Sequence, residues 1–309
     1  MGFRLPKRLG GGVLGSINVV LLGYSTVEAI PLFHLAPGGS ALRVLVRPLK
    51  SLECEASFEV CEWMRGPEVY PGVPLDARVL RHTVKMWKPS VVVLDGFEPL
   101  GSLSLEEFRG ALNGAGLMVG ARIHGVADLA GLEALDFAVT EDHSILTGFS
   151  EARERLLRAV RVMAKAGVHV EHVAYLWKPE VGVLGDTVEA LAALDVPLHV
   201  FIENPGGWNL VNRLYESLGG RLSYVYVHSE AYNILETRCP SCNTVVMARV
   251  PGILKASALT GGSCSKCGAP IKLRGNVLAR TPERLSRVTG GRTLWYNPLV
   301  FKRAGETGV

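Results

Sequence analysis

Apolar residues recur along the middle of the chain in two alternating patterns. The first consists of short, continuous runs rich in β-branched residues, as expected of strands that are buried on both faces. These runs occupy residues 42–46, 91–95, 117–123, 137–139, 170–176, 197–202 and 224–227. The second pattern has apolar residues at helical spacing, at residues 76–87, 105–115, 151–166, 187–194 and 208–218.

Strand–helix alternation of this kind predicts an α/β fold built from right-handed βαβ units around a parallel sheet. About six such units fit a partial (β/α)6, TIM-like barrel better than a complete eightfold one. We expect an N-terminal extension, the partial barrel, a small cysteine-rich domain and a basic tail, at residues 1–40, 41–237, 238–275 and 276–309.

Composition excludes disorder for most of the chain, because 48% of its 309 residues are hydrophobic and only 20% are charged. No run approaches the roughly 18 consecutive apolar residues of a membrane helix, so we expect no membrane association. The net charge is only +4, but residues 269–309 hold eight Lys or Arg against two Glu. Such a tail is either a solvated extension or a nucleic-acid contact that neutralises phosphates.

The cysteines indicate a metal site. Cys239 and Cys242 form one C-x2-C pair, Cys264 and Cys267 form a second, and 21 residues separate the pairs. Two such pairs present four thiolates in the tetrahedral arrangement that zinc prefers. We predict a zinc ribbon whose ion is structural, because four protein ligands leave no open position. Reduced, metal-binding cysteines also favour a cytoplasmic protein.

Several short segments carry the chemistry of the remaining chain. They are P-L-F-H-L-A-P-G-G-S-A-L at 31–42, C-E-A-S-F-E-V-C at 54–61, L-D-G-F-E-P at 94–99, V-H-V-E at 168–171, P-L-H-V at 197–200 and V-Y-V-H at 225–228. In this order they resemble radical SAM proteins related to pyruvate formate-lyase activating enzyme, most closely the radical SAM member of the AmmeMemoRadiSam system. The resemblance covers about residues 27–273 and implies a radical SAM barrel.

One position departs from that family. Cys54, Phe58 and Cys61 occupy the three places of its C-x3-C-x2-C loop, whose thiolates hold a 4Fe–4S cluster in the family. A benzyl side chain cannot ligate iron, and the neighbouring carboxylates of Glu55 and Glu59 are hard donors that substitute poorly for a thiolate. We therefore expect no standard 4Fe–4S cluster.

The resemblance also places a site for S-adenosylmethionine (SAM). It implies that Glu98 contacts the amino group of SAM, with Asp95, Gly96 and Pro99 beside it at the carboxyl end of the second strand, where barrel sites are built. Binding of SAM can therefore survive without cleavage. Two histidines near the ends of late strands, His199 and His228, are more simply explained as hydrogen-bonded polar residues than as metal ligands.

Three functions stay open at this point. The first is a degenerate radical-SAM-like protein that binds or scaffolds, beside other proteins of the AmmeMemoRadiSam system or an active paralogue. The second is an active radical SAM enzyme with a non-standard cluster ligand. The third is a zinc-ribbon protein that binds nucleic acid through its basic tail. The sequence names no substrate, because one fold hosts many reactions.

Overall fold

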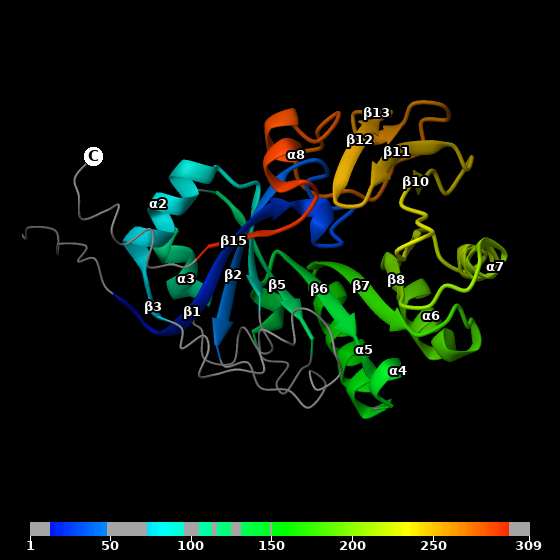
Figure 1. The fold of residues 1–309 in the computed structure, drawn as a ribbon, viewed down its shortest axis with the longest axis horizontal. Coiled ribbons are helices and arrows are strands. Elements are labelled where there is room, and N and C mark those ends of the chain that lie inside the picture. The colour runs from blue at the N-terminus through cyan, green and yellow to red at the C-terminus, as the bar shows by residue number, and fades with distance from the viewer. Residues whose placement is uncertain are drawn as a thin grey trace, which may run out of the picture.

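The computed structural model describes residues 13–47, 73–95, 105–112, 116–124, 131–148 and 150–296 (Figure 1). Its main sheet has the strand order β15-β1-β2-β4-β5-β6-β7-β8-β9, and β3 pairs with β1 at one side. Seven of the described strands, from β2 to β9 in that order, are parallel to their neighbours. They are β2 (Ser40–Arg47), β4 (Val91–Asp95), β5 (Met118–Ile123), β6 (Phe137–Asp142), β7 (His169–Leu176), β8 (Leu198–Ile202) and β9 (Val225–His228). The α/β class predicted from the sequence is confirmed.

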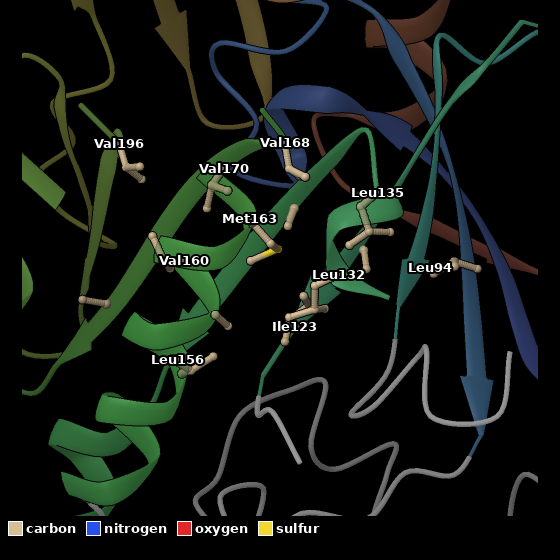
Figure 2. Packing of buried hydrophobic residues seen from close by; sticks show 14 of the residues in the cluster. Leu94, Ile123, Leu132, Leu135, Leu156, Val160, Met163, Val168, Val170 and Val196 are labelled. Carbon is tan, nitrogen blue, oxygen red and sulfur yellow. The ribbon is translucent and has the colours of Figure 1, made fainter. Parts of the chain in front are cut away.

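The connections between parallel strands are mostly helical. The helices are α2 (Ala77–Trp87), α3 (Leu105–Ala111), α4 (Ser144–Thr147), α5 (Ser150–Lys165), α6 (Gly185–Ala192), α7 (Trp208–Gly219) and α8 (Glu283–Thr289), with single 3-10 turns at η1 (Val27–Ala29), η3 (Leu132–Ala134) and η4 (Gly182–Leu184). Figure 2 shows Leu156, Val160 and Met163 of α5 packed in the apolar core that covers the outer face of the sheet. Their near-helical spacing is what made α5 readable from the sequence. None of the helices in the described part of the chain has the length and hydrophobicity of a membrane span.

Both ends of the described chain extend the main sheet. β1 (Val13–Thr26) pairs antiparallel with β2, and β3 (Val73–Asp76) and β15 (Leu294–Tyr296) pair antiparallel with β1. The sheet thus includes residues that the sequence analysis assigned to the N-terminal extension and to the basic tail. The three boundaries predicted between those four segments stay predictions.

The inner face of the parallel sheet is filled in two layers. The segment after β1, including Ile30, Leu32 and Leu35, packs on strand residues such as Val93 and Val139 in one apolar cluster. Because side chains alternate between faces along a strand, the next inward positions toward the carboxyl ends are polar or aromatic. They are Arg43, Asp95, Arg122, Glu141, Tyr175, Phe201 and His228. The apolar layer therefore lies beneath a charged one.

The cysteine-rich segment packs on the same inner face. β10 (Thr237–Arg238), β11 (Val245–Val250) and β12 (Ile253–Ser257) form a small antiparallel sheet, followed by the hairpin of β13 (Leu259–Thr260) and β14 (Ser263–Cys264). Residues of this region, Cys239 and Val246 among them, share a buried cluster with Phe33 and Tyr226. In Figure 1 the small sheet and α8 lie across the main sheet from α5 and α6.

Candidate functional site

The two C-x2-C pairs converge. The Sγ atoms of Cys239 and Cys267 lie 3.6 Å apart, and those of Cys242 and Cys264 lie 3.7 Å apart. Four sulfurs around one zinc at about 2.3 Å stand about 3.8 Å from one another, so the spacing fits a tetrahedral metal. All four ligand atoms lie within 4.8 Å of one another. This cluster can hold a metal ion.

Local turns explain why the sulfurs meet. Asn243 and Gly268, each directly after a C-x2-C pair, have φ of 56° and 76°, the left-handed conformation that closes each turn. Their N–H groups donate to the carbonyls of Cys239 and Cys264, each over 2.8 Å. Hydrogen bonds from Thr244 lower the pKa of Cys242 to about 6, which favours the thiolate form that metals bind.

A row of buried ions crosses the carboxyl ends of four adjacent parallel strands. Arg43 on β2 donates from Nε to Oδ2 of Asp95 on β4 over 2.7 Å, and Arg122 on β5 lies 3.9 Å from the same oxygen. Arg122 also pairs with Glu141 on β6. Both carboxylate side chains are completely buried. Alternating signs make this burial tolerable, because each charge has an opposite neighbour in place of water.

Electrostatics keep both carboxylates ionised. Burial alone raises the pKa of Asp95, but the guanidinium groups of Arg43 and Arg122 outweigh it and hold the pKa below its usual range. Burial likewise raises the pKa of Glu141, and Arg122 and His124 bring it well below normal. The row is therefore a fixed set of charges rather than a proton store.

Two histidines and a tyrosine surround the far oxygen of Glu141. His124 Nδ1 lies 3.2 Å and His143 Nε2 3.6 Å from Oε2, and the Tyr175 hydroxyl donates to it over 3.1 Å. The ligand atoms of His124, Glu141 and His143 lie close enough to one another to hold a cation. However, His124 Nδ1 and His143 Nε2 are 3.1 Å apart, and the centres of their rings are 5.4 Å apart. The difference is about twice the distance from a ring centre to a ring atom, so the two nitrogens lie almost on the line that joins the ring centres. The nitrogens therefore point at each other, as in an N–H···N hydrogen bond, and do not converge on an ion.

A cavity of about 900 Å³ opens beside the ion row. Arg43, Asp95 and Arg122 form one part of its wall, and Phe201 and His228 form another. The rest comes from later parts of the chain, namely Glu203, Ser229, Glu230, Asn233, Pro251, Arg292, Thr293 and Trp295 among others. Its wall carries both signs of charge.

The C-terminal part of the described chain lines one side of this cavity. Thr293 accepts a hydrogen bond from Arg43 over 2.8 Å, and the guanidinium of Arg43 stacks 4.7 Å from the ring of Trp295. Arg274 donates to backbone carbonyls of Asp136 and Gly167. One basic residue of the segment 269–309, Arg274, is thus committed to contacts within the chain.

A second buried network lies on the inner face between the strands and the small sheet. Glu171 on β7 is completely buried and accepts from the backbone N–H of Phe33 and His34 over 3.0 and 2.9 Å. It also bonds to Nε2 of His169 and His199 over 3.1 and 2.9 Å. Burial raises the pKa of Glu171, but these two histidines lower it well below normal. Glu171 therefore anchors the segment after β1 as an anion.

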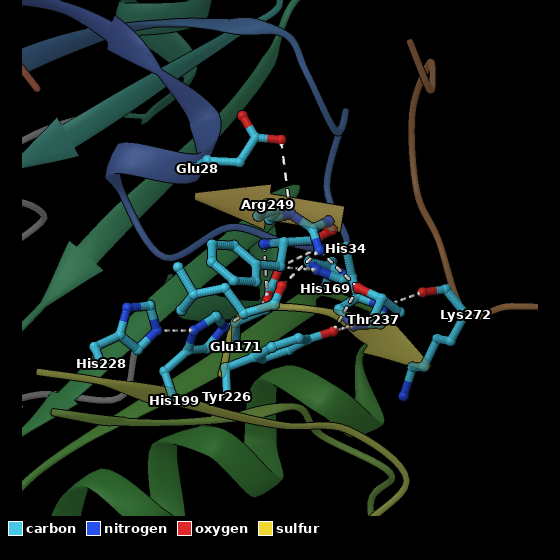
Figure 3. A network of polar contacts seen from close by, with 12 residues as sticks. Glu28, His34, His169, Glu171, His199, Tyr226, His228, Thr237, Arg249 and Lys272 are labelled. Atoms are coloured by element: carbon cyan, nitrogen blue, oxygen red, sulfur yellow. Dashed lines mark hydrogen bonds and ion pairs between the residues drawn. The ribbon is translucent and has the colours of Figure 1, made fainter. Parts of the chain in front are cut away.

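The same network continues in two directions, which Figure 3 shows. His34 Nε2 contacts the hydroxyl of Tyr226 at 2.6 Å, and that hydroxyl contacts Thr237, which accepts from Arg249. On the other side, His199 Nδ1 lies 3.0 Å from His228 Nε2. His228 is partly exposed, stacks on Phe201 with ring centres 4.2 Å apart, and lines the cavity.

Of the residues proposed from the sequence, the structure describes five. The four cysteines meet, and Asp95 lies in the cavity wall. The other six lie outside the described residues: Cys54, Phe58, Cys61, Gly96, Glu98 and Pro99. Sequence reasoning did not single out Arg43, Arg122 or Glu141 as site residues, and it quoted Glu171 only within the V-H-V-E segment. Arg43, Arg122 and Glu171 are each the single charged residue of a strand run, and a strand buried on both faces cannot expose such a charge to water. That signal was present in the sequence.

The chain has no sequence match to known families and only distant structural similarity to known proteins. No family model and no curated protein matches the chain. Among solved structures, Streptococcus suis SuiB bound to S-adenosylmethionine and a second structure of SuiB each align with a TM-score of 0.39 and 10% identity. Each alignment covers 50% of this chain, and 41% or 42% of the SuiB chain. The chain thus spans less than half the length of these structures.

Proposed function

We propose that this protein is a radical-SAM-like barrel that binds SAM at the carboxyl ends of its strands and does not cleave it reductively. One observation carries the proposal: a cavity of about 900 Å³, lined by both signs of charge, lies beside Asp95. Asp95 ends β4 and is the second residue of the L-D-G-F-E-P segment.

The cavity suits a small zwitterion. Its volume falls within the range of about 300–1,000 Å³ that small-molecule sites occupy. SAM carries a carboxylate, an ammonium and a sulfonium, so its site needs both cationic and anionic partners. Arg292 offers the first, and Glu203 and Glu230 offer the second. The Arg43–Asp95 pair is fixed in the wall before any ligand arrives, which lowers the cost of ordering on binding.

A binding experiment tests this directly. Equilibrium dialysis of radiolabelled SAM should give saturable binding to the wild-type protein. Glu203→Gln, in the cavity wall, should weaken it, whereas Glu189→Gln, on the exposed side of α6, should leave it unchanged. Absence of saturable binding, or equal loss in both variants, would contradict the proposed SAM site.

The missing thiolate accounts for the loss of reductive cleavage. After anaerobic reconstitution with iron and sulfide, wild-type protein should hold no reducible 4Fe–4S cluster, judged by iron counting and spin resonance. Phe58→Cys restores the three-thiolate loop and should gain iron under the same conditions. Four irons per chain in the wild type, with formation of 5′-deoxyadenosine from SAM, would show instead an active enzyme with an unusual ligand.

We further propose that the four cysteines hold one structural zinc. Their spacing fits Zn–S bonds, and four thiolates complete the coordination. Elemental analysis should find about one zinc per chain and no iron. Association with other proteins of the AmmeMemoRadiSam system, or with an active paralogue, is part of the same proposal and calls for co-purification from the source cell.

A further inference from the structure

The lone pairs of Glu171 are fully used. A carboxylate offers about four acceptor positions, and Glu171 receives four donors: two backbone N–H groups and two imidazole nitrogens. Since an ionised carboxylate only accepts, Nε2 of His199 must carry a proton. Nδ1 of the neutral His199 ring is then bare and acts as an acceptor. The anion thus fixes the tautomer of its neighbour.

The next ring is fixed in turn. His199 Nδ1 and His228 Nε2 are 3.0 Å apart, and the centres of their rings are 5.3 Å apart. The difference is about twice the distance from a ring centre to a ring atom, so the two nitrogens point at each other. Because His199 Nδ1 accepts, His228 Nε2 donates. Burial is the main cause that lowers the pKa of both rings, so both are neutral at pH 7. Nδ1 of His228 is therefore a bare acceptor, and no described residue hydrogen-bonds to it.

We propose that His228 is the proton-accepting group of the cavity and that Glu171 and His199 are positioning residues that hold its lone pair ready. The cavity would then take a ligand that presents an N–H or O–H group to His228. Phe201 stacks flat on the His228 ring and restricts its orientation, and both rings line the cavity. This inference does not depend on SAM binding.

Proton transfer along this row balances. When His228 Nδ1 takes a proton from the ligand, the ligand keeps the bonding electron pair and the Nε2 proton of His228 can pass to His199 Nδ1. His228 is then neutral again, in its other tautomer. His199 becomes an imidazolium hydrogen-bonded to the anion of Glu171, with 2.9 Å between His199 Nε2 and Glu171 Oε2. Positive charge moves from the cavity wall to a buried counter-ion, which stabilises it.

Nitrogen-15 NMR of the wild-type protein tests the proposal without any substrate. Two-bond proton–nitrogen correlations distinguish protonated from bare ring nitrogens, and the variant His228→Gln assigns the His228 signals. We expect both His199 and His228 with a proton on Nε2 and bare Nδ1 at neutral pH. A proton on His228 Nδ1, or an imidazolium at His228, would overturn the proposal.

Acylation by diethyl pyrocarbonate supplies a second readout. A bare imidazole nitrogen attacks the carbonyl carbon, and ethyl carbonate leaves. Mapping by mass spectrometry should find His228 modified, with the exposed His82 of α2 as reference in the same molecule. His199→Phe keeps an aromatic ring but removes the acceptor, and should slow acylation of His228 severalfold relative to His82. An unchanged ratio in this variant would refute the relay, whatever the outcome for SAM binding.

Discussion

Asp95 is the residue at which the charged layer can be tested most sharply. Its carboxylate is completely buried, and its partner Arg43 is 6% exposed. Asp95→Asn changes volume little but removes the anion that faces Arg43 and Arg122. Arg122 keeps its ion pair with Glu141. The direct contacts that Arg43 keeps among the described residues are uncharged, to Thr293 and Trp295, and Glu141 attracts it only at longer range.

The expected loss follows from the cost of an uncompensated buried charge. Removing one partner of a buried pair typically costs about 3–5 kcal/mol, so Asp95→Asn should lower the free energy of unfolding by about that much at neutral pH. Arg43→Met should cost less, because Asp95 still has Arg122 at 3.9 Å. In the double variant neither charge remains, and stability should recover part of the loss.

Urea unfolding followed by tryptophan fluorescence measures these differences, with an unchanged slope against denaturant as the check that the unfolded state is the same. The four proteins form a double-mutant cycle. If Asp95→Asn costs less than about 1 kcal/mol, or if the single losses add within about 0.5 kcal/mol, the two groups are not a coupled buried pair.

Three further outcomes are expected. Cys242→Ser should lower bound zinc toward zero by elemental analysis, because three thiolates hold the ion more weakly; unchanged zinc would contradict the four-cysteine site. Burial lowers the pKa of His34 from 6.5 to about 4, so as the pH falls the unfolded chain binds a proton at this residue before the folded chain does. The resulting stabilisation of the folded state, up to about 3 kcal/mol, is fully present above pH 6.5 and is lost as the pH falls toward 4. His34→Gln should flatten this part of the urea-unfolding profile, and an equal slope would refute it. Gly120→Ala should lower the free energy of unfolding by about 1–3 kcal/mol in the same assay, because the added Cβ would clash with the carbonyl oxygen and the ring of Phe137. A variant as stable as the wild type would contradict this clash.

Some residues of the site could be predicted from the sequence and others could not. Asp95 was found because it ends an apolar run and is the second residue of the L-D-G-F-E-P segment. Arg43, Arg122 and Glu171 carried a signal that went unused, a charge within a buried strand. His228 was noted only as a polar residue near a strand end, because nothing in the local sequence shows that His199 lies beside it.

The sequence by itself determined the local elements and the metal motif. Apolar runs and helical spacing act over a few residues, so strands such as β4 and helices such as α5 were predicted with nearly their observed bounds. The two C-x2-C turns are equally local. Only the tertiary structure decided that β1 and β15 join the main sheet, since pairing across about 270 residues leaves no periodic trace.

Register decided the chemistry in the same way. Alternation tells which residues share a face of one strand, but not which residues of the next strand stand beside them. The pairing of β7, β8 and β9 places Glu171, His199 and His228 in one hydrogen-bonded row. The charged row across β2 to β6 likewise exists only once neighbouring strands are aligned, because the partners of each charge lie 19 to 52 residues away in the chain.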